Sequence, residues 1–188
     1  YLRAFLTACP VGSGLYVGRD LRPSSPALAS HVIAAARGEG INVTDCGAVP
    51  TPSLALVAMQ AGAGAGMVTG SHIPADRNGL KFYLPRGEIS KADEAAIIAA
   101  LGRTSRRRNA ALSYCSDCSA LWSERYVAAF GTQGLAKLKI GVWSHSAVSR
   151  DAVQKTLELL GAEVVELGRS DTFIPVDTEA VPAWARAQ

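Results

Sequence analysis

The sequence has few cysteines, no long apolar run and no large excess of charge. Four cysteines in 188 residues are too few for a disulfide scaffold. No uninterrupted apolar stretch reaches the ~20 residues of a membrane span, and the first segment, "YLRAFLTACPVGSG", has helical spacing rather than a signal-peptide layout. The 19 basic and 16 acidic side chains give a net charge of +3, too even a balance to indicate a nucleic-acid partner. We therefore expect a globular, cytoplasmic protein with neither a membrane nor a nucleic acid as partner.

Two local clusters are weak signals for function. The basic stretch "RTSRRRN", residues 103–109, lies in a polar segment and is typical of a solvated linker. Cys115 and Cys118 form the only C-x-x-C, but a zinc site needs two further ligands, and neither a second pair nor an H-x₃₋₅-H follows. We therefore interpret these two residues as ordinary thiols near the start of a helix.

Alternating apolar segments predict an α/β fold. Strands are expected within residues 14–20, 41–47, 66–70 and 79–84. Helices are expected within residues 25–40, 49–66 and 90–101. Ser25 and Ser90 are predicted as helix N-caps, with Pro26 at the first position of its helix. The order strand, helix, strand, helix, strand is typical of a sheet with crossover connections.

The pattern of elements occurs twice. Between Gly102 and Ser119 the periodicity fades, which marks a candidate domain boundary. After a helix within residues 119–131, the segment 137–168 repeats the strand, helix and strand of residues 14–47. We expect the two segments to superpose with right-handed crossovers. The sequence thus predicts two similar α/β domains with mixed sheets flanked by helices: residues 1–116, and residues 117–188, the second incomplete.

The stretch "MVTGSHIPADRNGLKFY", residues 67–83, places polar side chains in a turn directly after a buried strand. A hydrolase nucleophile would need G-x-S-x-G, whereas Gly70 begins Gly-Ser-His-Ile-Pro, and the adjacent Ser71 and His72 usually point apart. The turn also lacks the G-x-x-x-x-G-K-[ST] of a phosphate cradle. A serine that carries a phosphoryl group needs an exposed turn and nearby cations, which Lys81 and Arg77 supply. An ordinary surface loop with a capping serine is the alternative.

The segment "TGSHIPADRNGLKFY" resembles the phosphoserine loop of the α-D-phosphohexomutases. The stretches "VGRDLRPSSPALA" and "VPTPSL" are similar to two further motifs of that family, so the resemblance runs over nearly the whole chain. It implies that Ser71 is phosphorylated in the active enzyme and that His72 is its general acid/base neighbour. Lys81 matches the lysine that contacts the transferring phosphoryl group.

Four other positions have two possible roles or differ from the family pattern. Arg19 and Arg22 match family arginines, for which buried scaffolding and substrate contact both stay open. Ile73 stands in place of the usual Asn, and Arg77 stands where many members have an aromatic residue.

The resemblance implies an isomerase of the bacterial phosphomannomutase/phosphoglucomutase branch. Such an enzyme transfers phosphate reversibly between positions 1 and 6 of mannose or glucose, through phosphoserine and a bisphosphate intermediate. Hexose 1,6-bisphosphate is the implied activator. Mg²⁺ is the implied cofactor, held by a phosphoryl oxygen on Ser71 and by aspartates outside this chain.

The family has four domains, so we expect this chain to be an N-terminal fragment that is inactive alone. Phosphoglucosamine mutase and a non-catalytic α/β interaction module are the alternatives. The sugar preferred and the oligomeric state are not predicted from these residues.

Overall fold

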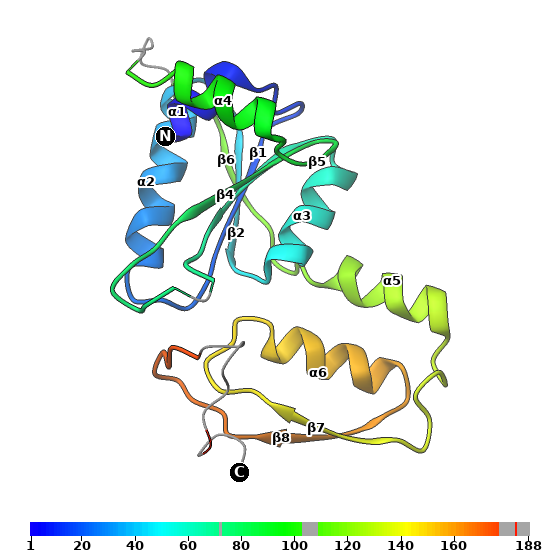
Figure 1. The fold of residues 1–188 in the computed structure, drawn as a ribbon. Coiled ribbons are helices and arrows are strands. Elements are labelled where there is room, and N and C mark those ends of the chain that lie inside the picture. Colours follow the sequence, from blue (N-terminus) through cyan, green and yellow to red (C-terminus); the bar gives the residue numbers. More distant parts are fainter. Residues whose placement is uncertain (72, 103–108, 177–182, 184–188) are drawn as a thin grey trace.

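The computed structural model describes residues 1–71, 73–102, 109–176 and 183 (Figure 1). The helices are α1 (Leu2–Ala8), α2 (Ser25–Gly38), α3 (Thr51–Gln60), α4 (Lys91–Ala99), α5 (Ala120–Phe130) and α6 (Arg150–Leu159). The strands are β1 (Leu15–Arg19), β2 (Val43–Ala48), β3 (Gly64–Val68), β4 (Leu80–Leu84), β5 (Gly87–Glu88), β6 (Leu112–Tyr114), β7 (Lys139–Trp143) and β8 (Glu163–Leu167).

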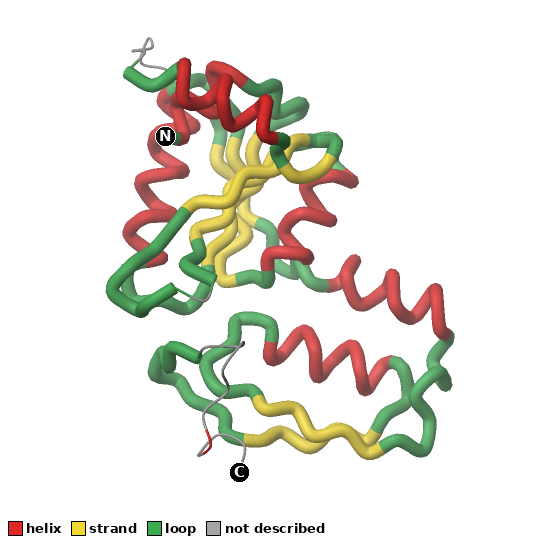
Figure 2. Tube along the Cα trace, viewed as in Figure 1, coloured by secondary structure: helices red, strands yellow, loops and turns green. Residues whose placement is uncertain are grey.

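The first six strands form one mixed sheet in the order β5-β4-β3-β1-β2-β6. Strand β1 runs parallel to both β2 and β3, β6 runs parallel to β2, and β4 returns antiparallel to β3. Helix α2 covers one face of this sheet and α3 covers the other (Figures 1 and 2). The predicted α/β class, with a mixed sheet flanked by helices, is confirmed.

The centre of the sheet is built from small and β-branched residues. All five residues of β3 are buried, as a strand covered on both faces requires. In β1, a Cβ at Gly18 would collide with Val49 and come close to Leu54, so the glycine lets α3 pack directly onto the strand. Two clusters of buried apolar side chains result, one on each face of the sheet.

Three details differ from the sequence predictions. The N-cap of α2 is Ser24 rather than Ser25, because Ser25 is buried and its hydroxyl donates to the carboxylate of Asp20. Strand β3 begins at Gly64, earlier than expected, because glycines that were assigned to the end of a helix belong to the buried strand. Strand β6 lies in the stretch where no element was predicted, and it extends the sheet by pairing with β2. The predicted cap of α4 at Ser90 is confirmed, with a complete capping box.

The remaining elements form a smaller unit. Strands β7 and β8 are parallel and are joined by α6, the same order as β1, α2 and β2. Helix α5 leads from the first sheet to this unit and packs against both α3 and α6 (Figure 1). Residues 103–108 of the predicted basic linker lie outside the described residues. In the part of the chain that the structure describes, no helix is long and apolar enough to cross a membrane.

Candidate active site

Ser71 lies just beyond the carboxyl end of β3, in the loop that returns to β4. The backbone N–H of Thr69 donates to the carbonyl oxygen of Gly79 at 3.1 Å, which closes the base of this loop. Ser71 is exposed and has a φ of 50°, a left-handed conformation that is uncommon for residues other than glycine. Such strain is found preferentially at functional sites, and α/β proteins bind ligands at this edge of the sheet.

A buried arginine holds the loop backbone. Arg22 is 2% exposed and follows β1, the strand beside β3. Its guanidinium donates to the carbonyl oxygens of Ser71 (3.0 Å), Ile73 (2.7 Å), Pro74 (2.7 Å) and Arg77 (3.1 Å). The rigid fork of N–H donors suits several acceptors at once, so one side chain fixes the course of the whole turn.

The carboxylate of Asp20, in the same turn as Arg22, also supports the serine loop. Asp20 accepts from the Thr69 hydroxyl at 2.9 Å and from the Gly70 N–H at 3.3 Å, and it pairs with the Arg22 Nε at 3.3 Å. Its other oxygen accepts from the Ser25 hydroxyl and from the backbone N–H of Arg22. A Cβ at Gly70 would collide with the guanidinium, so only glycine fits between the two charged groups. Asp20 is therefore a support of the loop with both oxygens engaged.

The structure tests the predicted roles of the site residues to different extents. For Arg22, buried scaffolding is what the contacts bear out, whereas the role of Arg19, partly buried in β1, stays a prediction. Lys81 is exposed on β4, paired in register with Met67. Within the described ranges, no hydrogen bond or ion pair joins Lys81 to Ser71, so their joint action on a phosphoryl group stays a prediction. His72 lies outside the described residues.

A cleft of about 340 Å³ lies between the serine loop and the smaller unit. One wall is formed by Asp20, Leu21, Thr69 and Ser71. The opposite wall is formed by residues 145–149, together with Phe173, Ile174 and Val176. The ring of Phe173 also lies 5.0 Å from the centre of the Arg22 guanidinium, a cation–π contact that links this wall to the loop support. Ser71 thus faces a hollow with hydroxyl groups on both sides.

His145 in the second wall was not predicted from the sequence. It has a φ of 31°, and its ring lies 4.9 Å from the ring of Trp143. Burial, and secondarily the charge of Arg150, lower the pKa of His145, so the ring is neutral near neutral pH. The internal repeat is the signal that points to this turn, because it follows β7 just as the Asp20–Ser24 turn follows β1.

The fold and the site define a class of protein: an α/β protein with an exposed serine, held by a buried ion pair, at the carboxyl edge of its sheet. Residues 2–108 match the family described as phosphoglucomutase/phosphomannomutase, alpha/beta/alpha domain I, and the chain belongs to this family. The resemblance to the phosphohexomutases is thereby confirmed.

Two curated relatives carry the name phosphomannomutase. One, from Sinorhizobium fredii, is 48% identical over 179 residues, which cover 92% of this chain and 38% of the relative. The other, from Salmonella muenchen, is 44% identical over 162 residues, covering 86% of this chain and 34% of the relative. This chain therefore spans little more than a third of the length of these relatives. Phosphoglucosamine mutases match at lower identity, for example 31% for that of Desulforamulus reducens.

A solved structure agrees with the fold. A phosphoglucomutase/phosphomannomutase family protein from Burkholderia thailandensis matches with a TM-score of 0.72 at 25% identity. The match covers 90% of this chain and 40% of that one, so it includes the smaller unit as well as the first sheet.

Proposed function

We propose that this chain is part of a phosphomannomutase in which Ser71 carries the exchanged phosphoryl group. The proposal includes activity on mannose or glucose phosphates, a hexose 1,6-bisphosphate as activator and a cytoplasmic location. The higher identity to phosphomannomutases than to phosphoglucosamine mutases supports the choice between these two activities. The chain alone spans too little of its relatives' length to bind a sugar phosphate at both ends, so we expect it to be inactive by itself.

The position of Ser71 is the observation that carries the proposal. A phosphoserine is a dianion with three acceptor oxygens, so it requires an exposed site that stays fixed when charge is added. Ser71 is exposed, and the four carbonyl contacts of Arg22 hold its loop from beneath. Because Asp20 is engaged by donors on both oxygens, its negative charge is offset beside the incoming dianion.

In the proposed reaction, the bond between the Ser71 Oγ and phosphorus breaks while a hydroxyl oxygen of the hexose phosphate bonds to that phosphorus. His72 takes the proton of the attacking hydroxyl, and Lys81 offsets negative charge on the transferring group. The Ser71 oxygen takes up a proton as it leaves. After the bisphosphate turns round, the Ser71 oxygen loses that proton and bonds to the other phosphorus, while the bond from this phosphorus to its sugar oxygen breaks and the sugar oxygen is protonated. The phosphoserine is thereby restored. The cleft beside Ser71 is where the sugar would lie.

The described residues do not form a magnesium site on their own. Mg²⁺ needs several oxygen ligands, and this chain offers an oxygen of a phosphoryl group on Ser71. Asp20, the carboxylate of the loop support, has both oxygens occupied by hydrogen-bond donors. Any magnesium ion would therefore depend on carboxylates outside this chain, and no step of the proposed reaction is derived through it.

The test uses the complete gene product, incubated with glucose 1,6-bisphosphate and analysed by peptide mass spectrometry. We expect phosphate on Ser71, and a loss of several orders of magnitude in kcat for Ser71→Ala, because the nucleophile is removed. Lys81→Ala should be milder, about 10²-fold, because the nucleophile stays and one stabilising charge is lost.

Ser30→Ala, which removes an exposed hydroxyl from α2, is the matched control and should retain parental kinetics. Phosphate on another residue, or a Ser71→Ala enzyme within tenfold of the parent, would contradict the assignment. A protein that is never phosphorylated and turns over no hexose phosphate would support the non-catalytic module instead. Faster turnover of glucosamine phosphates than of mannose phosphates would favour the phosphoglucosamine mutase.

A further inference from the structure

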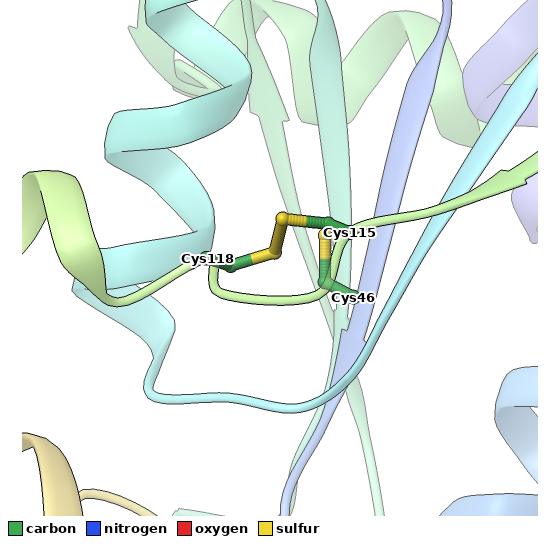
Figure 3. Close-up of side chains that lie close together, drawn as sticks. All are labelled: Cys46, Cys115 and Cys118. Atoms are coloured by element: carbon green, nitrogen blue, oxygen red, sulfur yellow. A yellow bond between two sulfur atoms is a disulfide. The ribbon is translucent and has the colours of Figure 1, made fainter.

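Three cysteine sulfurs meet on the face of the sheet covered by α3 (Figure 3). Cys46 lies on β2, Cys115 directly follows β6, and Cys118 lies two residues before α5. The three sulfur atoms all lie within 4.8 Å of one another. Cys46 and Cys118 are buried and Cys115 is half-buried, so the cluster sits inside the fold.

The sheet register brings Cys46 to the C-x-x-C pair. Asp45 on β2 pairs with Tyr114 on β6, and the backbone N–H of Cys115 donates to the carbonyl oxygen of Asp45 at 2.9 Å. The Asp117 carboxylate then accepts from the Ser119 N–H at 3.1 Å, which turns the chain into α5. The strand register and these two hydrogen bonds therefore fix where all three side chains begin.

The cluster corrects the expectation of two ordinary thiols. Cys115 and Cys118 are paired as a disulfide in the structure, and Cys46 stands beside them as a free, buried thiol. The sequence pattern did not include Cys46, because a ligand contributed by a neighbouring strand has no fixed spacing in the chain.

The distances suit a metal bound by thiolates. With zinc–sulfur bonds of about 2.3 Å, tetrahedral geometry places the sulfurs roughly 3.8 Å apart. The sulfur of Cys46 is already within 4.8 Å of the other two, and the bonded sulfurs of Cys115 and Cys118 can separate to this distance once they are reduced. Cys46 is a free, buried thiol next to Asp45 in the chain, so its thiolate needs a positive charge close by. A divalent cation supplies the charge that would stabilise its thiolate.

We propose that, when Cys115 and Cys118 are reduced, the thiolates of Cys46, Cys115 and Cys118 bind one thiophilic divalent cation of the Zn²⁺ class. Reduction adds two electrons and two protons to the disulfide. Two thiol molecules can supply both and are joined as a disulfide, or a phosphine supplies the electrons and becomes a phosphine oxide, while water supplies its oxygen and the two protons. On binding, the three S–H protons pass to solvent and three sulfur–metal bonds form. Among the described residues, no further His, Cys, Asp or Glu joins the group, so the fourth position is open to water or another ligand.

The bound ion would connect β2, the end of β6 and the start of α5. It would thereby fasten the helix that leads to the smaller unit onto the first sheet. This role is separate from phosphoryl transfer at Ser71, so the proposal stands or falls independently of the proposed activity.

The experiment titrates the chain with Cd²⁺ after reduction with a phosphine and removal of oxygen. We expect one Cd²⁺ per chain, with the ultraviolet charge-transfer absorption of cadmium–thiolate bonds, and competition by Zn²⁺. Cys46→Ser and Cys118→Ser should each weaken binding by about 100-fold or more, because each removes a ligand. Cys9→Ser is the matched control, since Cys9 is also a buried free cysteine but lies in the other apolar cluster.

Circular dichroism would show whether each variant is folded. Should Cys46→Ser unfold, alkylation of the parent decides instead: Zn²⁺ should slow the labelling of Cys46 and Cys115 by at least tenfold. Failure of the reduced parent to bind Cd²⁺ would overturn the proposal. So would undiminished binding by a folded Cys46→Ser chain, equal loss in Cys9→Ser, or labelling that ignores Zn²⁺.

Discussion

Arg22 shows how a charged residue can serve the backbone rather than a ligand. Its side chain is buried, yet the guanidinium donates to four loop carbonyls and forms an ion pair with Asp20. Burying a charge is costly unless it is paired and hydrogen-bonded, and here both conditions are met. The loop therefore depends on Arg22 for its conformation, and Ser71 depends on the loop for its exposure.

Replacement of Arg22 should destabilise the chain. Arg22→Ala leaves Asp20 without its cation and should lower the free energy of unfolding by about 3–5 kcal/mol. Arg22→Lys keeps the charge but loses the planar set of N–H donors. Because loop carbonyls are then left without a donor, the free energy of unfolding should fall by about 1–3 kcal/mol. Urea unfolding measures both. Arg86→Ala, which removes a 61% exposed arginine from a surface pair with Asp93, is the control and should leave the midpoint nearly unchanged. Equal effects at the two positions would contradict the scaffolding role.

His145 should make stability depend on pH. Its pKa is lowered in the folded state, mainly by burial and further by Arg150, so below the ordinary value of about 6.5 the unfolded chain binds a proton more readily. The stability contribution is therefore complete above that value and is lost as the pH falls. His145→Asn keeps a residue that tolerates positive φ, and it should flatten the decline in unfolding free energy between about pH 7.5 and about pH 5.5. His31→Asn, on the exposed side of α2, should retain the parental slope. A parental slope in His145→Asn as well would mean that other groups cause it.

Site residues that belong to one contiguous motif could be predicted from the sequence. Site residues that come together only in the folded chain could not. The Gly-Ser-His turn is contiguous, so its serine was predicted from sequence, and scaffolding by Arg22 was among the stated alternatives. Asp20 lies in the stretch "VGRDLRPSSPALA" together with Arg22. Its hydrogen bonds, however, join the end of β1 to Thr69 and Gly70 at the end of β3. Cys46 likewise gains its neighbours only when β2 and β6 pair, and His145 becomes part of the cleft only when the two units meet.

Among the elements, α4 has the clearest local signal. Ser90 accepts from the backbone N–H of Asp93, and the Asp93 carboxylate accepts from the backbone N–H of Ser90. These reciprocal bonds satisfy two donors that a helix start leaves unpaired. This is why the helix and its cap could be predicted from residues 90–101 alone.

Ser90→Ala should destabilise the chain by about 0.5–2 kcal/mol, the usual cost of removing an N-cap that accepts a hydrogen bond. Thermal or urea unfolding measures the difference. Ser119→Ala is the matched control, because Ser119 is the N-cap of α5 but its side chain makes no capping bond. Similar losses in both variants would show that the capping bond is not what stabilises α4.

Strand β6 was missed for a physical reason. It is three residues long, half-buried to exposed, and set in a polar stretch, so no apolar period reveals it. Its place is determined by β2, whose free edge accepts it in parallel register. The longer strands were predicted because each predicted segment carries several apolar or β-branched residues of its own.

At the scale of the whole molecule, the two units differ in how much they bury. Both large apolar clusters consist of residues up to Cys118. Beyond that point, the fully buried apolar side chains of the described part are Ala152 and Leu160. The proposed division at residues 116 and 117 falls within the link between β6 and α5, which also contains the cysteine pair. We infer that the first unit supplies most of the stability of this chain.

Hydrogen exchange of this 188-residue chain should separate the two units. Strand β3 is buried throughout, whereas β7 and β8 each consist of half-buried and exposed residues, and a two-stranded sheet is marginal by itself. Amides of β7 and β8 should therefore exchange by local opening, about 100-fold or more faster than those of β1 and β3, which require global unfolding. Mass spectrometry of peptic peptides provides the rates, and added urea should accelerate the β1 and β3 amides more steeply, because their opening exposes more surface. Equal rates and equal urea slopes in both sheets would show instead that residues 1–176 unfold as one cooperative unit, and the division into two domains would then have to be abandoned.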